Sequence, residues 1–335
     1  MTPSSARRLA IVLGIAGVAA TLVGCAATKA QRAHQLQNQA RWTAEAVETL
    51  ITQGDASSLM AAALLFRDPR QRPLVGREPL ALAARAQDRT PTDPAAVWLR
   101  YALCAGTASC DAVSSGARLR SLDPDNGMGW WPQLQSSVTN HDTVASDQIL
   151  DHLANAQSFR VYFNPTAVQV TDALGRVRGP AARALHLYGQ SMALMTAMGG
   201  FAAQGIPPLQ VLSNACRDAT HAAARRATCM KIFSTLMNTA DSTLLQSFGA
   251  SLSLRLAPRG STEFLAAERW HRTQDWRNAQ FGILFNSWRI AAALKVQLTA
   301  MRQFAREEDS VLAVLRHYRR PFDPPADWVG PRHWH

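Results

Sequence analysis

Acidic, basic and imidazole side chains come together at one place in the sequence, at a spacing that a general-base site could use. They are Glu268, His271, Arg272 and Asp275. Because they lie three to four positions apart, a helix would carry them on one face. A carboxylate beside a histidine can orient and charge the imidazole, as general-base catalysis requires. The same spacing is typical of ion pairs on a solvated helix, and one face supplies no nucleophile or oxyanion donor. We therefore expect a solvated face, with a catalytic role as the alternative.

The rest of the chain offers little that points to catalysis. It has no phosphate-binding glycine loop and no His-Glu-x-x-His zinc motif. Residues 189–193, Gly-Gln-Ser-Met-Ala, fail the Gly-x-Ser-x-Gly pattern of hydrolases at the last position. His333 and His335 flank Trp334 and could hold a metal weakly, but a frayed chain end is the simpler interpretation. We therefore predict a protein that is not an enzyme and that has no cofactor or metal site.

The N-terminal residues have the organisation of an export signal. Arg7 and Arg8 precede an apolar run over residues 9–23, and no acid occurs before Cys25. The run is shorter than the roughly 20 residues that span a bilayer, which favours a cleaved signal over a permanent anchor. The sequence Leu-Val-Gly-Cys at residues 22–25 resembles the lipobox of bacterial lipoproteins.

The lipobox resemblance implies cleavage before Cys25 and acylation of its thiol and amino group, with palmitate as a typical chain. Ala26 rather than Asp follows Cys25, which in Gram-negative lipoproteins resembles the rule for sorting to the outer membrane. Several acyl chains on one residue hold a protein stably, whereas one chain holds it marginally. The resemblance therefore implies a lipid anchor in the bacterial envelope, in the outer membrane and facing the periplasm. An ordinary signal peptide with a chance cysteine, or an uncleaved short anchor, is the alternative.

Four further cysteines lie in the body of the chain. They are Cys104, Cys110, Cys216 and Cys229. An even number in an exported protein suggests disulfides, and four cysteines allow three connectivities. Pairing of sequence neighbours is the simplest, because Cys104 and Cys110 flank a turn of small residues. Buried free thiols are an alternative, and neither neighbouring pair has the spacing of a zinc site.

A bond between Cys216 and Cys229 would require a break in the helical pattern. On one continuous helix their Cα atoms would be about 20 Å apart. A disulfide needs Cα atoms roughly 4.4–6.8 Å apart. If the two cysteines pair, the helix must therefore break between them, near residues 217–220.

Helical periodicity runs through most of the sequence, and Gly, Pro and Asp punctuate the junctions. The pattern predicts helices over residues 30–53, 58–67, 79–87, 94–104, 110–122, 180–201, 209–216, 223–237, 242–256, 280–306 and 310–319, with a further start at 261–262. Residues 159–163 are the best candidate for a strand, and a helix starting at Pro165 fits as well. The predicted fold class is therefore all-α.

Two Asp-Pro pairs, each followed by a tryptophan, suggest an internal repeat. The first pair is at residues 93–94 with Trp98, and the second is at 123–124 with Trp130. The prolines are 30 residues apart and the tryptophans 32 residues apart, a period typical of stacked helical hairpins. Asp-Pro is also a good helix start in general, so chance spacing is the alternative.

The second copy resembles a tetratricopeptide hairpin. The family's small residue, its closing proline and the tryptophan of the next repeat correspond to Ala112, Pro124 and Trp130. Gly116 stands where the family has a bulky aromatic residue, and Gln133 where it has leucine. The resemblance covers residues 78–156 and implies an α-solenoid of helical hairpins rather than any activity.

Four regions follow from these signals. We expect a signal peptide over residues 1–24, a helical-hairpin region over 25–175, a longer-helix bundle over 176–320 and an extended tail over 321–335. The boundary near 175 is placed where Gly175, Gly179 and Pro180 interrupt the helical pattern.

Composition limits the class of protein. The chain has 335 residues, of which 47% are hydrophobic and 18% charged, so it can form a core and is not globally disordered. Five cysteines are too few for a disulfide-dense scaffold, and the single long apolar run excludes a multi-pass membrane protein.

The mature chain would be strongly basic. The full sequence carries +11, and removal of residues 1–24 takes away two arginines and no acid, which leaves +9. Near the C-terminus the basic residues are Arg316, Arg319, Arg320 and Arg332, interleaved with Tyr318, Trp328 and Trp334. In a cytoplasmic protein this pattern would indicate nucleic acid. Behind a lipidation signal, anionic lipid or an anionic envelope polymer is more accessible, so no nucleic-acid partner is expected. An arginine-rich solvated surface is the simpler interpretation.

The chain as a whole resembles proteobacterial lipoproteins with tetratricopeptide-like repeats, a resemblance that implies no particular activity. Stacked hairpins offer a concave surface for a protein or peptide, so we expect a non-enzymatic interaction scaffold anchored through Cys25. One alternative is an envelope hydrolase, or an inhibitor of one, that uses the face with His271. The other is a binder of anionic envelope polymer through the C-terminal arginines.

Overall fold

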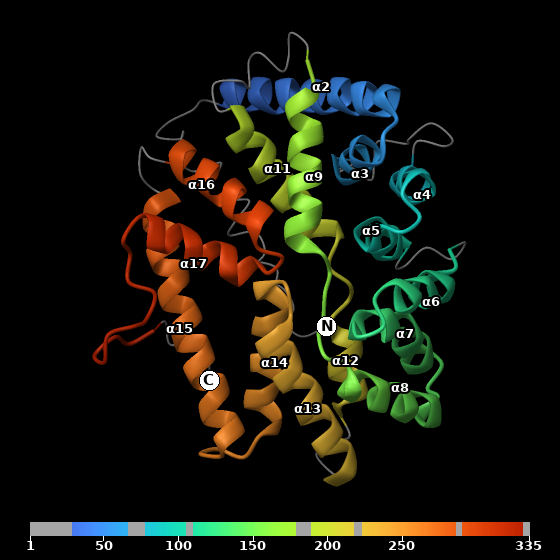
Figure 1. Ribbon diagram of the computed structural model, residues 1–335, viewed down its shortest axis with the longest axis vertical. Coiled ribbons are helices and arrows are strands. Elements are labelled where there is room, and N and C mark those ends of the chain that lie inside the picture. Colours follow the sequence, from blue (N-terminus) through green and yellow to red (C-terminus); the bar gives the residue numbers. More distant parts are fainter. Residues whose placement is uncertain are drawn as a thin grey trace. The chain divides into compact units, whose positions relative to one another are not determined.

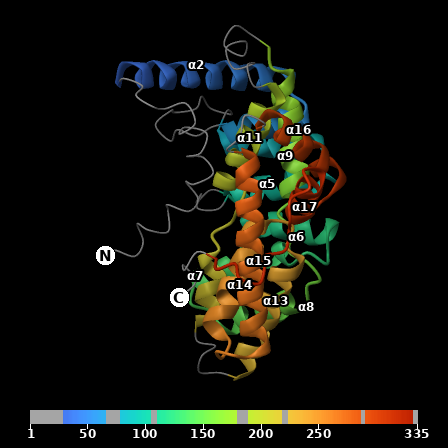
Figure 2. The ribbon, with the colours of Figure 1, turned by 90° about the vertical axis from the view of Figure 1, so that its left-hand side faces the viewer.

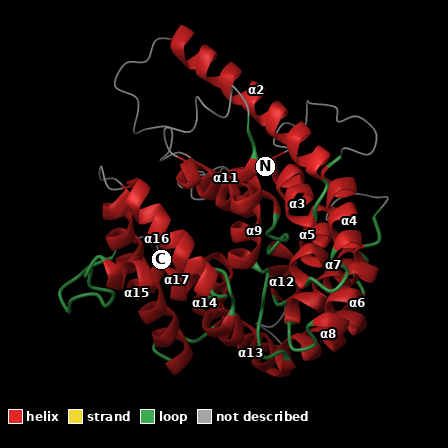
Figure 3. Ribbon diagram, turned by 45° about the horizontal axis from the view of Figure 1, so that its top comes forward, coloured by secondary structure: helices red, strands yellow, loops and turns green. Residues whose placement is uncertain are grey.

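The computed structural model describes residues 29–65, 78–104, 110–178, 189–217, 223–285 and 290–330. Within these ranges the chain forms fifteen α-helices and one 3-10 helix, and no β-strand (Figures 1 and 3). The predicted all-α fold is therefore confirmed. The predicted signal peptide, Cys25 and Arg332 lie outside the described residues.

The helices group into two compact units that interleave along the sequence. The first contains α2 (Lys29–Gln53), α3 (Ala56–Leu65), α4 (Pro79–Arg89), α11 (Gly189–Gln204) and the part of α9 (Phe163–Arg176) from Ala167 onward. The second contains α5 (Pro94–Cys104), α6 (Ala112–Leu122), the 3-10 helix η1 (Gly127–Trp130), α7 (Trp131–Thr139), α8 (Thr143–Asn155), α12 (Gln210–Ala215), α13 (Ala223–Thr239), α14 (Thr243–Leu256), α15 (Thr262–Phe285), α16 (Ile290–Gln303) and α17 (Glu307–His317). The two units are not separated by a single boundary near residue 175. Helix α11 belongs to the first unit because it packs on α3, which lies more than 120 residues earlier in the sequence.

Helix α3 forms the centre of the first unit. Its last eight residues, Ser58 to Leu65, are all buried, and it contacts α2, α4 and α11. Gly200 of α11 comes so close that an added Cβ would lie 3.1 Å from the carbonyl oxygen of Leu64. Asp55 caps this helix, since its Oδ1 accepts a 3.0 Å hydrogen bond from the backbone N–H of Ser58.

The second unit begins with antiparallel hairpins, as the repeat pattern predicted. Neighbouring helices α5 and α6, and then α7 and α8, pack against one another. The two Asp-Pro pairs are not equivalent, however. Pro94 begins α5 directly, whereas Pro124 lies in the turn before η1, and α7 begins only at Trp131.

The structure explains why two positions depart from the tetratricopeptide pattern. An added Cβ on Gly116 would lie 2.8 Å from both the carbonyl oxygen of Gly129 and Cγ of Pro132, so no aromatic side chain fits there. Gln133 accepts a 2.9 Å hydrogen bond from the guanidinium of Arg120, which also lies 4.2 Å from the ring centroid of Trp130. Close backbone packing and a polar contact thus replace the family's apolar pair.

The remaining helices of the second unit build around two apolar clusters. Helices α13 and α14 run side by side (Figures 1 and 2), and Met237, Ala250 and Ala267 join them to α15. The second cluster joins α15, α16 and α17 and is built from Leu284, Ala293, Ala300, Val311, Val314 and Leu315. Helix α8 packs on α13, where Lys231 donates a 3.0 Å hydrogen bond to Asn155.

The prediction of one helix over residues 280–306 is wrong. Helix α15 ends at Phe285, and α16 runs only from Ile290 to Gln303. Leu284 and Ala293 belong to the same apolar cluster, although on one straight helix they would be about 13 Å apart along the axis. Both helices thus contribute to one apolar cluster.

Residues 157–162, which include most of the candidate strand, form an irregular segment. Its only strand-like feature among the described residues is an isolated bridge between Asn126 and Ser158. Side chains satisfy its backbone instead: Oδ1 of Asn126 accepts from the N–H of Arg160 at 2.9 Å, and Asp241 accepts from Tyr162 at 2.6 Å. Helix α9 begins directly afterwards, at Phe163.

Candidate functional site

The structure divides the four residues of the predicted acid-base cluster. Glu268 is exposed on α15 and Asp275 is half-buried, whereas His271 is 2% exposed and faces α14. The imidazole Nε2 of His271 and the hydroxyl of Ser251 share a hydrogen bond of 3.3 Å. Burial lowers the pKa of His271 to about 4, so the imidazole is neutral at neutral pH. The expectation of one solvated face is therefore wrong, because the packing of α14 on α15 covers His271.

Arg272, the fourth residue of the cluster, binds the C-terminal part of the chain. Its Nη2 donates to the carbonyl oxygens of Pro325 at 2.7 Å and Ala326 at 2.8 Å, and its Nε donates to that of Trp328 at 3.2 Å. The backbone N–H of Trp328 donates to the carbonyl of Pro325 at 3.1 Å, so the arginine covers a tight turn. A side chain predicted from sequence as part of an acid-base cluster is thus a binder of main-chain carbonyl groups.

Two more side chains of α15 bind the same segment. The indole Nε1 of Trp276 donates to the carbonyl oxygen of Pro321 at 3.1 Å, and Nε of Arg277 donates to that of Phe322 at 3.1 Å. We call Arg272, Trp276 and Arg277 the donor cluster, and we call residues 320–330 the strap. The strap lies as a loop beside α15 in Figure 1, where it is the red segment after α17. The sequence predicted an extended tail over 321–335; up to Gly330, where the described residues end, the chain is irregular and has a turn at 326–327. Its attachment to α15 was not predicted.

Two aromatic side chains anchor the strap. Trp328 packs edge to face on Trp276, with ring centroids 5.5 Å apart. Phe322 packs against the apolar cluster of α15, α16 and α17. Arg277 is itself held by Glu308 of α17 at 2.6 Å. The strap is therefore joined to the helices by five carbonyl contacts and two aromatic contacts.

Three of the four arginines of the predicted basic patch lie among the described residues. Arg316, Arg319 and Arg320 lie at the C-terminal end of α17 and in the turn after it, where Arg316 and Arg319 are exposed and Arg320 is half-buried. Trp328, expected to be interleaved with them, packs on α15 instead. The guanidinium of Arg316 lies 5.7 Å from the ring centroid of Phe322, so this arginine borders the strap.

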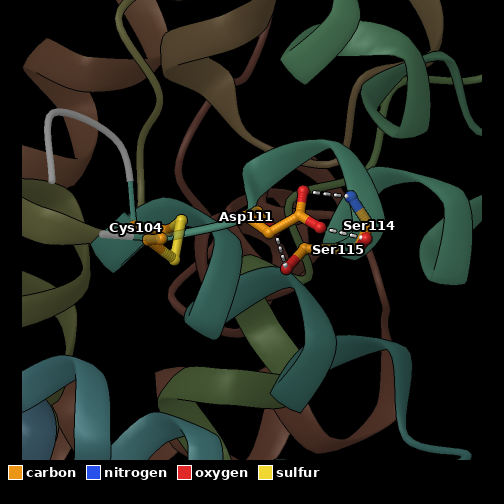
Figure 4. The surroundings of a disulfide bond; sticks show 5 residues. Cys104, Asp111, Ser114 and Ser115 are labelled. Carbon is orange, nitrogen blue, oxygen red and sulfur yellow. Dashed lines mark hydrogen bonds between the residues drawn. A yellow bond between two sulfur atoms is a disulfide. The ribbon is translucent and has the colours of Figure 1, made fainter. Parts of the chain in front are cut away.

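The four body cysteines form the two local pairs. The Cα atoms are 5.5 Å apart in Cys104–Cys110 and 6.0 Å apart in Cys216–Cys229. The first bond lies directly before the start of α6, where Asp111 accepts a 3.0 Å hydrogen bond from the N–H of Ser114 (Figure 4). The second joins the end of α12 to α13, and the helical pattern is interrupted between them as the pairing required. Both bonds clamp helix connections rather than a reactive site.

A buried polar junction in the second unit is the other place where acidic groups gather. Asp241 is 3% exposed, and its carboxylate accepts from the backbone N–H groups of Val161 at 2.9 Å and Tyr162 at 2.6 Å. Burial, together with the nearby charge of Glu307, raises the pKa of Asp241 to about 7 against the opposing effect of these bonds. Glu307 accepts from the N–H of Thr243 at 2.8 Å, and burial raises its pKa as well. The contacts are all to groups that close helix ends, so the junction serves the fold.

Within the described ranges, no group of three or more His, Cys, Asp or Glu side chains is placed to hold a metal ion. None of the described helices is both long enough and apolar enough to cross a membrane. No protein-family model, no curated protein and no solved structure matches this chain.

Proposed function

We propose that this chain is a lipid-anchored protein of the bacterial envelope that acts as a non-enzymatic scaffold for a protein partner. The observation that carries the proposal is the donor cluster, because α15 already binds an irregular segment through hydrogen bonds from its side chains to main-chain carbonyl groups. Binding of extended segments through main-chain groups is a common mode of protein recognition. The packed helical hairpins of the second unit supply a rigid support for such a surface.

The anchor is proposed from the sequence. The Leu-Val-Gly-Cys motif supports acylation of Cys25, and Ala26 supports sorting to the outer membrane with the body facing the periplasm. Two disulfides are in keeping with an oxidising compartment of this kind. With the signal peptide removed, the body keeps a formal charge of +9, which favours a position near anionic lipid headgroups.

The burial of His271 weighs against the hydrolase alternative. A general base must lie within hydrogen-bond reach of the proton that it removes from a substrate. His271 is 2% exposed, and it lies on the side of α15 that faces α14. The ring of Trp270 lies against it, with ring centroids 5.2 Å apart. We therefore propose a structural role for this imidazole.

The experiment that tests the scaffold is in-cell cross-linking of the native protein, followed by purification from membranes and mass spectrometry. One protein enriched reproducibly over a mock sample is the expected result. The test variant is Arg272→Gln, which should reduce that enrichment while leaving membrane attachment unchanged. Absence of any enriched protein would contradict the scaffold.

The anchor has its own test. Cys25→Ser should leave an unprocessed precursor without lipid, because acylation of the thiol precedes cleavage in the lipoprotein pathway that the motif implies. Metabolic labelling with an alkyne fatty acid and a gel-shift assay of the precursor measure this directly. A normally processed, membrane-bound Cys25→Ser protein would refute the lipid anchor and leave the scaffold to be judged by cross-linking.

A further inference from the structure

We infer that the donor cluster is a binding site for an acidic, proline-rich segment of a partner protein, and that the strap is a displaceable intramolecular occupant of this site. The inference deepens the proposed scaffold function, on which it rests, by naming the chemistry of the partner. It starts from the contacts of Arg272, Trp276 and Arg277 with the strap.

The donor cluster and the strap are complementary in hydrogen-bonding type. Arginine and tryptophan side chains carry N–H donors and no acceptor. Three of the first six strap residues, Pro321, Pro324 and Pro325, have no backbone N–H, so they cannot donate to the strap's own carbonyl groups. The carbonyl of Pro325 accepts from the N–H of Trp328 as well as from Arg272. Each of the five side-chain contacts from α15 indeed ends on a strap carbonyl oxygen. The site therefore recognises the main-chain conformation of its ligand, and the absence of N–H groups that would compete for the ligand's carbonyls, more than any one ligand side chain.

Aromatic packing and charge narrow the class of segment. Trp328 packs on Trp276, and Phe322 packs on the helix cluster, so a ligand needs apolar anchors at a matching distance. The strap carries Asp323 and Asp327, both exposed, beside the helix that holds the two arginines of the donor cluster. An acidic, proline-rich segment with aromatic residues therefore fits the site. Recognition of proline-rich chains by aromatic and donor side chains is an established mode of peptide binding.

The strap is only partly buried, as an exchangeable segment has to be. Most of its residues are exposed: Pro321, Asp323, Pro325, Ala326, Asp327 and Val329. Its described contacts with α15 come from side chains, without the backbone ladder that fixes a strand or helix. Segments with few buried side chains open locally at low free energy. A ligand from a partner can therefore compete with the strap at the same donors.

The test uses a labelled synthetic peptide with the sequence of residues 320–330, and the full-length protein purified from membranes in detergent. Fluorescence anisotropy measures binding of the peptide. In the unaltered protein the tethered strap competes at an effective concentration on the order of millimolar, so binding should be weak. Trp328→Ala removes one anchor of the strap and should strengthen peptide binding by about tenfold or more.

Paired variants decide whether the donor cluster is the site. Adding Arg272→Lys to Trp328→Ala keeps the charge but loses the planar group that reaches three carbonyls, so peptide affinity should fall about tenfold. The matched control is Arg269→Lys, on an exposed arginine of the same helix, which should leave affinity unchanged. A peptide with its three prolines replaced by alanine should bind about tenfold more weakly, because it regains competing N–H groups. Near-UV circular dichroism confirms that each variant is folded.

Four results would overturn the inference. Equal peptide affinity in the unaltered and Trp328→Ala proteins would mean that the strap does not occupy the peptide site. Loss of affinity in the Arg269→Lys control as large as in Arg272→Lys would mean that the contacts of Arg272 with the strap carbonyls are not what holds the peptide. A dimer in light scattering that the free peptide dissociates would assign the site to the strap of a second copy rather than to a partner. Peptide binding without any cross-linked protein would contradict the scaffold function alone, and cross-linking that survives Arg272→Lys would contradict this inference alone.

Discussion

Replacing Gly249 with alanine should destabilise the protein although alanine is the better helix former. Gly249 lies in α14 where this helix meets α13. An added Cβ would stand 2.8 Å from Cβ of Leu236, 2.8 Å from the backbone nitrogen of Met237 and 2.8 Å from the carbonyl oxygen of Phe233. Two of these atoms belong to the backbone of α13, so no side-chain rotation can relieve the contact.

The magnitude follows from two opposing effects. Unstrained contacts between carbon atoms are about 3.5–4.0 Å, so α13 and α14 would have to separate by about 1 Å. Overpacking of this kind costs about 1–3 kcal/mol, and the backbone contacts place Gly249→Ala at the upper end. Replacement of glycine by alanine in a helix returns about 1 kcal/mol. We therefore expect a net loss of about 2 kcal/mol in the free energy of unfolding.

Gly282 provides the matched control. It lies in α15, and an added Cβ there would meet nothing within 4 Å. Gly282→Ala should therefore stabilise the protein by about 0.5–1 kcal/mol. Guanidinium titration followed by far-UV circular dichroism, with the disulfides intact, measures both variants. If both substitutions shift the midpoint in the same direction, the close approach of α13 and α14 is not what determines the residue at 249.

Further predictions concern titration, a buried hydroxyl and the disulfides. Because the pKa of His271 falls from 6.5 in the unfolded chain to about 4 in the fold, the unfolded chain binds more protons in this range, so its contribution to stability rises with pH. Relative to His271→Gln, the free energy of unfolding of the unaltered protein should therefore increase by up to about 3 kcal/mol between pH 4 and pH 6.5 in parallel urea titrations. A difference between the two proteins that stays constant with pH would contradict this. Tyr162→Phe removes the hydroxyl that donates to Asp123 at 2.5 Å and should cost about 1–2 kcal/mol in the same titration at neutral pH, whereas unchanged stability would show that the contact contributes nothing. Replacing Cys216 and Cys229 with alanine should cost about 3 kcal/mol, and the same change in the shorter loop of the other disulfide about 2 kcal/mol; equal or reversed losses in thermal unfolding would contradict the loop-entropy argument.

Helix starts and turns are determined locally, which is why the sequence predicted many of them. Asp55 and Ser261 accept hydrogen bonds from the N–H three residues later, as capping residues do. Gly54 and Gly260 adopt φ values of +68° and +80°, and glycine is the residue that tolerates this at the end of α2 and in the turn before α15. The free energy of such features depends on a few neighbouring residues, so their signals can be read along the chain.

The cysteine pairing lies between local and tertiary information. Spacing showed that a bond from Cys216 to Cys229 needs a helix break, and the structure ends α12 and begins α13 accordingly. Spacing alone left three connectivities open. Only the packing of the helices brings each pair to a bonding distance.

The all-α class and most helix positions can be read from the amino-acid order, because periodicity and helix-end signals are local. The export signal with its expected lipid anchor at Cys25 is likewise a property of the linear sequence. Which helix faces are covered depends on the packing of the folded chain. The periodicity of α15 is the same whether His271 faces solvent or α14, and its burial follows from the packing of that neighbour. The donor role of Arg272 depends on a segment more than fifty residues later, which it reaches at Trp328. Such contacts leave no mark in the local pattern, because their energy exists only when distant parts of the chain meet.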